Sequence, residues 1–195
     1  IKRRQLIEPL DEKRNGLSQA KSRLETAIQE RAESKAAMHA KAWGREPIKR
    51  TGVEEKFKSR VVRYVRLVVE GTERNPYAKS GYGIDEFEIW TPGSNGRNVA
   101  ALSMGGSATG ASRIAEDFAE AYTAQLTIDG KFGARWIAQG SELTITLAEP
   151  TEIERVYFSS DRTGDAGDHS IASFVAEYRI EVSSEGRLWD VVADS

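Results

Sequence analysis

The sequence contains no cysteine. This absence excludes disulfide bonds, thiolate metal sites, covalently attached c-type haem and cysteine nucleophiles. Histidine is scarce, with only His39 and His169, and the chain has neither a Gly-x-Ser-x-Gly segment nor a phosphate-binding glycine loop. The carboxylates of Asp165 and Asp168 could in principle act in acid–base catalysis, but no pattern around them indicates a catalytic cleft. We therefore predict that the chain is not an enzyme.

Long apolar runs are absent as well. A membrane-spanning helix needs about 18 or more apolar residues in succession, and no such stretch occurs. The first four residues (IKRR) are not followed by the apolar region of a signal peptide. The chain begins without Met and ends directly after a strand pattern. We interpret both ends as cuts in a longer protein.

Composition is that of a globular protein with a polar surface. The 195 residues are 39% hydrophobic and 30% charged, with a formal net charge of -2. This length is enough for one medium β-domain and a helical appendage. A near-neutral balance gives no electrostatic reason to expect a nucleic-acid partner.

The first part of the chain has helical spacing. Leu10, Leu17 and Leu24 recur every seven residues, which predicts a helix over residues 9–42 inside a helical, coiled-coil-like segment at residues 1–55. Its narrow apolar stripe favours self-association or docking on a helix of the parent protein. The alternative is a solvated spacer helix.

From residue 60 onward the pattern is that of short strands. The stretch 61–70 (VVRYVRLVVE) is rich in β-branched residues, and 84–90 (IDEFEIW) has alternating polarity. Turn signals such as Asp129-Gly130 and Glu149-Pro150 separate the candidates. Strands without intervening helices favour a mainly β, antiparallel sandwich or jelly roll. The further strand candidates are residues 124–128, 142–147, 153–159, 177–183 and 188–193.

Four stretches together carry a family resemblance. They are residues 98–112, residues 128–136 with an Asp-Gly and Trp136, residues 143–153 (LTITLAEPTEI), and residues 178–189 (YRIEVSSEGRLW). In this order they resemble the discoidin family, also called coagulation-factor type C domains, and the family 32 carbohydrate-binding modules. The resemblance implies a galactose-binding-like jelly-roll sandwich over residues 60–195 that binds carbohydrate without catalysis.

The order of two strand motifs departs from that family. The stretches 63–67 (RYVRL) and 85–90 (DEFEIW) resemble its last two strands, yet here they come first. A circular permutation explains this, since the ends of such a sandwich lie close together. The alternative is that residues 60–91 end one domain and 98–195 begin another. A permuted single domain predicts that the strand around 64–69 pairs in the same sheet system as Ile180 and Trp189.

The permuted order behind a helical segment resembles modules inserted in planctomycete-type surface proteins that also carry cytochrome c-like domains. That resemblance implies an extracytoplasmic location, periplasmic or at the cell surface. No haem is expected on this fragment, because it lacks the haem-binding Cys-x-x-Cys-His.

The family resemblance also implies a structural calcium ion. Asp129 matches the family's loop aspartate and Glu86 its last-strand glutamate, while Ala134 replaces a usual Thr or Ser. Calcium needs six to eight oxygen ligands, some of them backbone carbonyls. The alternative is that Asp129-Gly130 is a plain turn and Glu86 is solvated.

Two loops have the chemistry of a sugar site, in which an aromatic ring packs on the C–H face and polar groups bind hydroxyls. The candidate ligands are Tyr77, Tyr82, Arg162, Asp165 and His169. The alternatives are that the tyrosines cover the core and that Arg162 pairs with Asp161 or Asp165. We predict a carbohydrate-binding module; the alternative function is docking against neighbouring domains of the parent protein, with no glycan site.

Overall fold

The computed structural model describes residues 13–28, 30, 48–73, 78–116, 118–164 and 172–195. The chain forms two compact units, Ile1–Arg45 and Glu46–Ser195. In the first unit residues 13–28 form a helix whose Leu17 and Leu24 side chains are 74% and 61% exposed. Leu10 and most of the rest of the predicted helix lie outside the described residues. Within the described part of the chain, no helix has the length and apolar character needed to cross a membrane.

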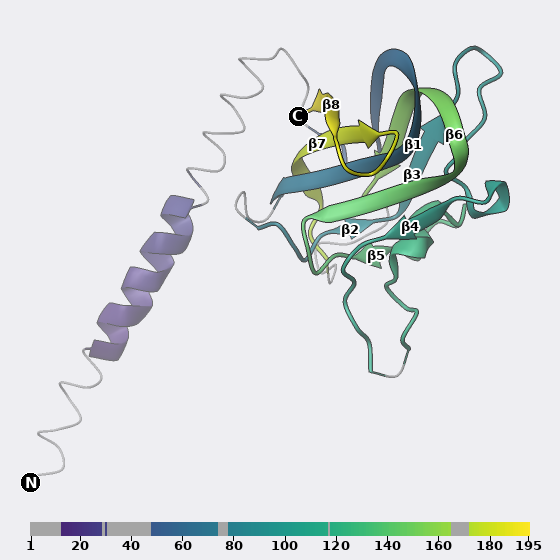
Figure 1. Ribbon diagram of the computed structural model, residues 1–195. Helices are drawn as coiled ribbons and strands as arrows, with labels where there is room; N and C mark the ends of the chain where they lie inside the picture. Colours follow the sequence, from purple (N-terminus) through teal and green to yellow (C-terminus); the bar gives the residue numbers. More distant parts are fainter. Residues whose placement is uncertain (1–12, 29, 31–47, 74–77, 117, 165–171) are drawn as a thin grey trace, which may run out of the picture. The chain divides into compact units, whose positions relative to one another are not determined.

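The second unit is mainly β, as the strand patterns predicted, and its sheets are antiparallel (Figure 1). The main sheet has the order β3-β6-β1-β7-β8, with β4 also paired to β6, and β2 pairs separately with β5. The strands are β1 (Val53–Thr72), β2 (Gly83–Ile84), β3 (Glu86–Trp90), β4 (Ser107–Thr109), β5 (Trp136–Ile137), β6 (Glu142–Ser159), β7 (Val175–Ser183) and β8 (Asp190–Asp194); two short 3-10 helices are η1 (Leu102–Met104) and η2 (Ala124–Ile128).

The transposed motifs join one sheet. Leu67 of β1 pairs with Ile180 of β7, and β8 pairs with β7 in turn. Both β1 and β3 pair with β6. The predicted pairing is therefore confirmed for Ile180, whereas Trp189 lies one residue before β8 and outside the strands. Residues 60–91 and 98–195 share one sheet, so the alternative of two separate incomplete domains is wrong.

Strand β6 unites two stretches that were predicted as separate strands. Thr151 of β6 pairs with Val62 of β1, but the next pair along the ladder joins Thr146 of β6 to Tyr64 of β1. Residues 147–150 therefore form an irregularity in the ladder. Pro150 falls in this irregularity, where its missing N–H breaks no regular ladder bond. The predicted turn at Glu149-Pro150 is thus a bulge inside a long strand.

Three predicted boundaries need correction. Strand β1 begins at Val53, inside the segment predicted as helical to residue 55, because the alternation of 53–58 continues the strand and places Glu55 inward against the Tyr178 hydroxyl. Residues 124–128 form η2, not a strand, because positions 124, 127 and 128 are the buried ones. Strand β8 begins at Asp190, not at residue 188.

The core draws on both parts of the permuted order. Alternate β1 residues Val65, Leu67 and Val69 are fully buried. Phe158 of β6 stacks with Phe87 of β3 (6.0 Å between ring centroids) and meets Tyr178 of β7 edge-on at 4.9 Å. Further fully buried side chains include Trp136, Ile84, Ile89, Ile128, Leu143, Ile145 and Leu147.

Candidate functional site

A buried carboxylate ties two loops together beside β3. Asp85 immediately precedes β3 and is 1% exposed. One carboxylate oxygen accepts the Gly133 N–H at 3.0 Å, and the other accepts the Arg162 N–H at 2.8 Å. Asp85 therefore fixes residues 129–135 next to residues 160–164. We call these two loops, together with Glu86 and Glu88 of β3, the two-loop rim.

The first loop of the rim is a set of tight turns. The Asp129 carboxylate accepts the Lys131 N–H at 2.8 Å. Gly130 and Gly133 have φ angles of +74° and +97°, a region that disfavours other residues. Between them Phe132 is held at the surface with its side chain 55% exposed.

The second loop carries Arg162, whose guanidinium lies between two rings. Its central carbon is 4.1 Å from the Tyr157 ring centroid and 5.4 Å from the Phe132 ring centroid. The guanidinium also forms an ion pair with Glu88. The other Glu88 oxygen accepts the Trp90 indole N–H at 2.9 Å. These contacts fix the orientation of a planar cation against an exposed aromatic ring.

A further carboxylate lies at the base of the second loop. The Asp161 side chain is 1% exposed and lies 3.6 Å from both the Arg50 and the Arg135 guanidinium. Arg50 also donates to the Gly164 carbonyl at 3.1 Å. The loop is therefore held by charge pairs beneath the rim as well as by Asp85.

Glu86 is a buried acid facing the first loop. It is 3% exposed, and its Oε1 has no hydrogen-bond partner among the described residues. Burial above all, and then the charges of Asp129, Glu88 and Asp85, raise the pKa of Glu86 from 4.5 to about 8, against the opposing effect of a backbone hydrogen bond from Gly130. A bound cation would remove this repulsion and provide the missing partner.

The fit of calcium to this position is therefore partial. The orphaned Glu86 oxygen beside Asp129 suits a hard cation. Within the described ranges, however, no group of three or more His, Asp or Glu side chains is placed to hold a metal. Backbone carbonyls and water would have to provide the remaining ligands.

Of the seven predicted site residues, three lie at the rim, one is buried in the core and three lie outside the described residues. Glu86 and Asp129 lie close enough for their charges to interact, and Arg162 lies on the rim. Glu86 is not solvated, and Arg162 forms an ion pair with Glu88. Tyr77, Asp165 and His169 lie outside the described residues.

Tyr82 is a correction. We predicted an exposed loop ring, but Tyr82 is fully buried and meets Trp136 edge-on, with 5.5 Å between the ring centroids. The reason is the short pairing of the next residues, Gly83 and Ile84, with β5, which turns the ring into the core. Burial also raises the pKa of its hydroxyl. Its ring is therefore part of the core and not a surface for a ligand.

Sequence reasoning missed four residues that form or support the rim: Asp85, Glu88, Phe132 and Tyr157. A signal for Phe132 was present, because an apolar ring in a loop beside Gly133 and Lys131 has no strand face to bury it. Asp85 gave no such signal, since its two bonding partners lie 48 and 77 residues further along the chain.

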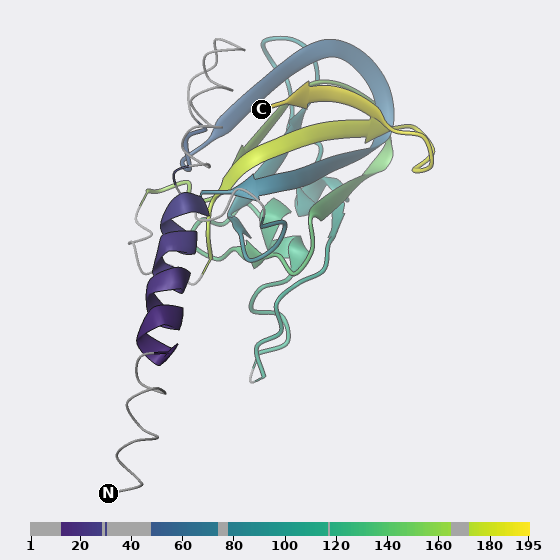
Figure 2. The same ribbon diagram turned by 90° about the vertical axis from the view of Figure 1, so that its left-hand side faces the viewer.

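A second exposed feature is the loop over residues 111–123, which we call the finger. Figures 1 and 2 both show it projecting beyond β4 and β5. Its base is fixed to β5 and the following residues by the Arg113 N–H to the Ile137 carbonyl (2.8 Å) and the Gln139 N–H to the Ala111 carbonyl (2.7 Å). Ile114 and Phe118 are 82% and 73% exposed.

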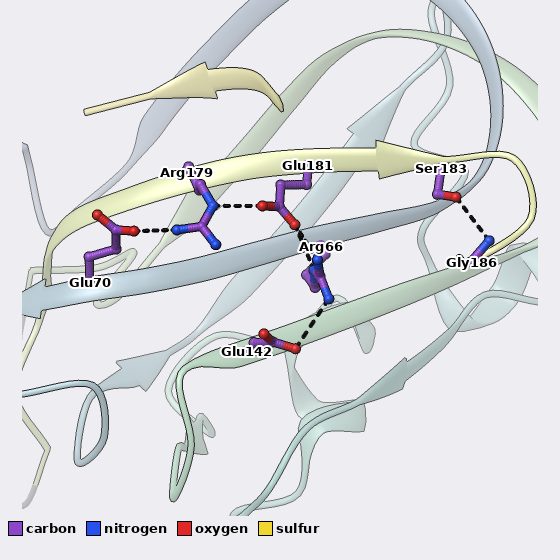
Figure 3. Close-up of polar contacts among 7 residues, drawn as sticks. All are labelled: Arg66, Glu70, Glu142, Arg179, Glu181, Ser183 and Gly186. Carbon is purple, nitrogen blue, oxygen red and sulfur yellow. Dashed lines mark hydrogen bonds and ion pairs between the residues drawn. The ribbon is translucent and has the colours of Figure 1, made fainter. Parts of the chain in front are cut away.

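The outer face of β7, β1 and β6 carries a charge network (Figure 3). Arg66 pairs with Glu181 and with Glu142, and Arg179 pairs with Glu181 and Glu70. Burial would raise the pKa of Glu181, but hydrogen bonds from Arg179 and Arg66 outweigh it and hold that pKa low. The Arg66 guanidinium carbon also lies 4.1 Å from the Trp189 ring centroid. The partners satisfy one another, so we assign this network to stability.

Comparison with known proteins gives no relative: no protein-family model, curated protein or solved structure matches the chain.

Proposed function

We propose that the second unit is a non-catalytic carbohydrate-binding module with a discoidin-type, galactose-binding-like jelly-roll sandwich in permuted strand order. The pairing of β1 with β7 and of β3 with β6 supports the permuted order. The shared core and the long bent strands β1 and β6 support a sandwich-like arrangement. The parent protein would act outside the cytoplasm, in line with the resemblance.

The observation that carries this proposal is the exposed ring of Phe132 beside fixed polar groups. Its neighbours Arg162 and Glu88 are held by ion pairing, and the loop by Asp85. An apolar ring can pack on the C–H face of a sugar, while the guanidinium and carboxylate edges bind hydroxyl groups. Since these groups are ordered before binding, little entropy is lost when a ligand binds.

The proposal includes a structural cation between Glu86 and Asp129. It is supported by the unpartnered Glu86 oxygen and by the repulsion that raises the pKa of this acid. Its role would be to hold the Asp129 turn, and with it Phe132, against β3.

Polysaccharide-retardation electrophoresis tests the proposal. We expect at least one soluble polysaccharide to retard the chain, and Phe132→Ala to weaken that binding by about tenfold, the equivalent of about 1.4 kcal/mol. Leu188→Ala is the matched control, because Leu188 is an exposed apolar side chain (86%) outside the rim. A screen without retardation, or an equal loss in both variants, would overturn the proposal.

The finger favours a second candidate function, docking against neighbouring domains of the parent protein. Two large, exposed apolar side chains on a projecting loop are typical of a contact surface. Ile114→Ser with Phe118→Ser should abolish binding to separately produced flanking domains while leaving polysaccharide retardation unchanged. Unchanged domain binding in this variant would exclude the finger as the docking surface.

A further inference from the structure

The aromatic ring of Phe132 is one end of a longer surface feature. Across the outer face of β3 and β6, Glu88 pairs with Tyr157 and Trp90 pairs with Arg155. These four side chains are half-buried and share one face of the sheet, because positions two apart on a strand point the same way. We call Phe132, Arg162, Tyr157, Trp90 and Arg155 the aromatic strip.

Rings and guanidinium groups are in contact along the strip. Arg162 lies against Phe132 and Tyr157, as described above, and the Arg155 guanidinium lies 4.7 Å from the Trp90 ring centroid. Both cations are compensated, Arg162 by Glu88 and Arg155 by Glu54 at 2.8 Å. The strip therefore presents rings and oriented polar groups whose charges are compensated.

The strip is also rigid. The Trp90 indole donates to Glu88, and the Tyr157 hydroxyl donates to the Thr51 carbonyl at 3.0 Å. The Tyr157 ring fills the space over Gly52, where a Cβ would lie only 1.5 Å from the tyrosine oxygen. A surface held in this way is ready to bind without rearrangement.

The two ends of the strip are too far apart for one sugar. Tyr157 and Arg155 are two positions apart on β6, which separates them by about 7 Å along the strand. Phe132 lies in the loop whose Gly133 N–H bonds to Asp85 at the start of β3, whereas Trp90 is the last residue of that strand. A single pyranose ring that packs on Phe132 cannot also reach Trp90.

From this geometry we infer that the strip binds several consecutive units inside a polysaccharide chain, which lies along it from Phe132 to Trp90. This inference rests on the proposed carbohydrate-binding function and specifies its ligand as an extended chain rather than a terminal sugar.

Charge excludes a polyanionic chain as the favoured ligand. Residues 46–195 contain 17 basic and 24 acidic residues, a net charge of -7. Aromatic and arginine side chains in alternation also suit single-stranded nucleic acid, but that ligand needs uncompensated positive charge on the protein. Both arginines of the strip are paired, so an uncharged polysaccharide fits better.

The test compares chain lengths. Oligosaccharides of increasing length, prepared from the polysaccharide that retards the chain, are titrated by calorimetry. We expect affinity to rise with length until both ends of the strip are covered. Trp90→Ala should weaken binding of the long oligosaccharides by about tenfold, as expected for loss of an aromatic anchor, and leave binding of the shortest ones unchanged. Phe132→Ala should weaken binding at every length.

Controls distinguish loss of the extended site from loss of carbohydrate binding altogether. Arg155→Lys keeps the charge but loses the planar group over Trp90, so it checks the same end of the strip in a variant less prone to misfolding. Leu188→Ala should bind as the unmodified chain does. Equal affinity for the monosaccharide and the long chain, with Trp90→Ala neutral throughout, would refute the extended site while leaving carbohydrate binding intact. If no polysaccharide binds, the proposed function itself is wrong.

Discussion

Replacing Asp85 removes the group that joins the two loops of the rim. In Asp85→Asn the side chain keeps almost the same size, but only one oxygen remains to accept a hydrogen bond. The amide NH₂ must then face a second donor, either the Gly133 N–H or the Arg162 N–H. Because the site is 99% covered, water cannot easily replace the lost acceptor.

The magnitude follows from the two bonds. A hydrogen bond to a charged group contributes about 1.5–3 kcal/mol, and leaving one buried partner unpaired costs a similar amount. We expect Asp85→Asn to lower the free energy of unfolding by about 1.5–3 kcal/mol. For a chain of this size that corresponds to a fall in Tm of about 3–12 °C. Asp85→Ala, which loses both acceptors, should lower it further.

Thermal melting and amide hydrogen exchange measure the effect. The N–H groups of Gly133 and Arg162 should lose protection in Asp85→Asn, while core amides of β1 keep theirs relative to global stability. Asp190→Asn is the control, because its carboxylate is 80% exposed and its ion pair with Arg60 contributes at most about 1 kcal/mol. Our reasoning is refuted if Asp85→Asn melts like the unmodified chain and both amides stay protected.

Two further predictions concern Glu86 and the helix. Because the folded state raises the Glu86 pKa from 4.5 to about 8, it binds this proton more tightly than the unfolded chain, and stability should fall as pH rises between those values. In Glu86→Gln the Tm should fall less as pH rises over this range. Millimolar calcium should raise the Tm of the unmodified chain at pH 8 but not the Tm of Glu86→Gln. An unchanged Tm of the unmodified chain in calcium would count against the cation. Leu17 and Leu24 are exposed, so we expect the chain to self-associate through them and Leu17→Ser with Leu24→Ser to be monomeric by ultracentrifugation. If the unmodified chain is already monomeric at high concentration, self-association is wrong.

Much of the fold could be predicted because strand patterns are local. The β-branched stretch 61–70 predicted the strand that lies within β1, and the transposed motifs predicted that it joins the same sheet as Ile180. The errors occurred where local pattern and tertiary context disagree. Residues 124–128 have apolar content that fits a strand, yet they have no strand partner and form η2.

The candidate site was only partly predictable. Glu86, Asp129 and Arg162 were named from the sequence, and the structure brings the first two together and places the third on the rim. Tyr82 was assigned to a ligand surface because it stands in a loop whose residues have the chemistry of a sugar site, but the pairing of β2 with β5 buries it. A sequence pattern cannot separate a tyrosine that covers the core from one that faces solvent.

Sequence patterns alone predicted the β character of the second unit and the pairing of its transposed motifs within one antiparallel sheet system. These depend on a two-residue period and on turn residues, which are properties of neighbouring positions. Only the tertiary structure decided that Asp85 joins two loops, that Arg162 pairs with Glu88, and that Phe132 and Trp90 end one strip. Each of these contacts depends on side-chain distance and burial between segments far apart in the chain, and the free energy of a charge or a ring is set by those surroundings.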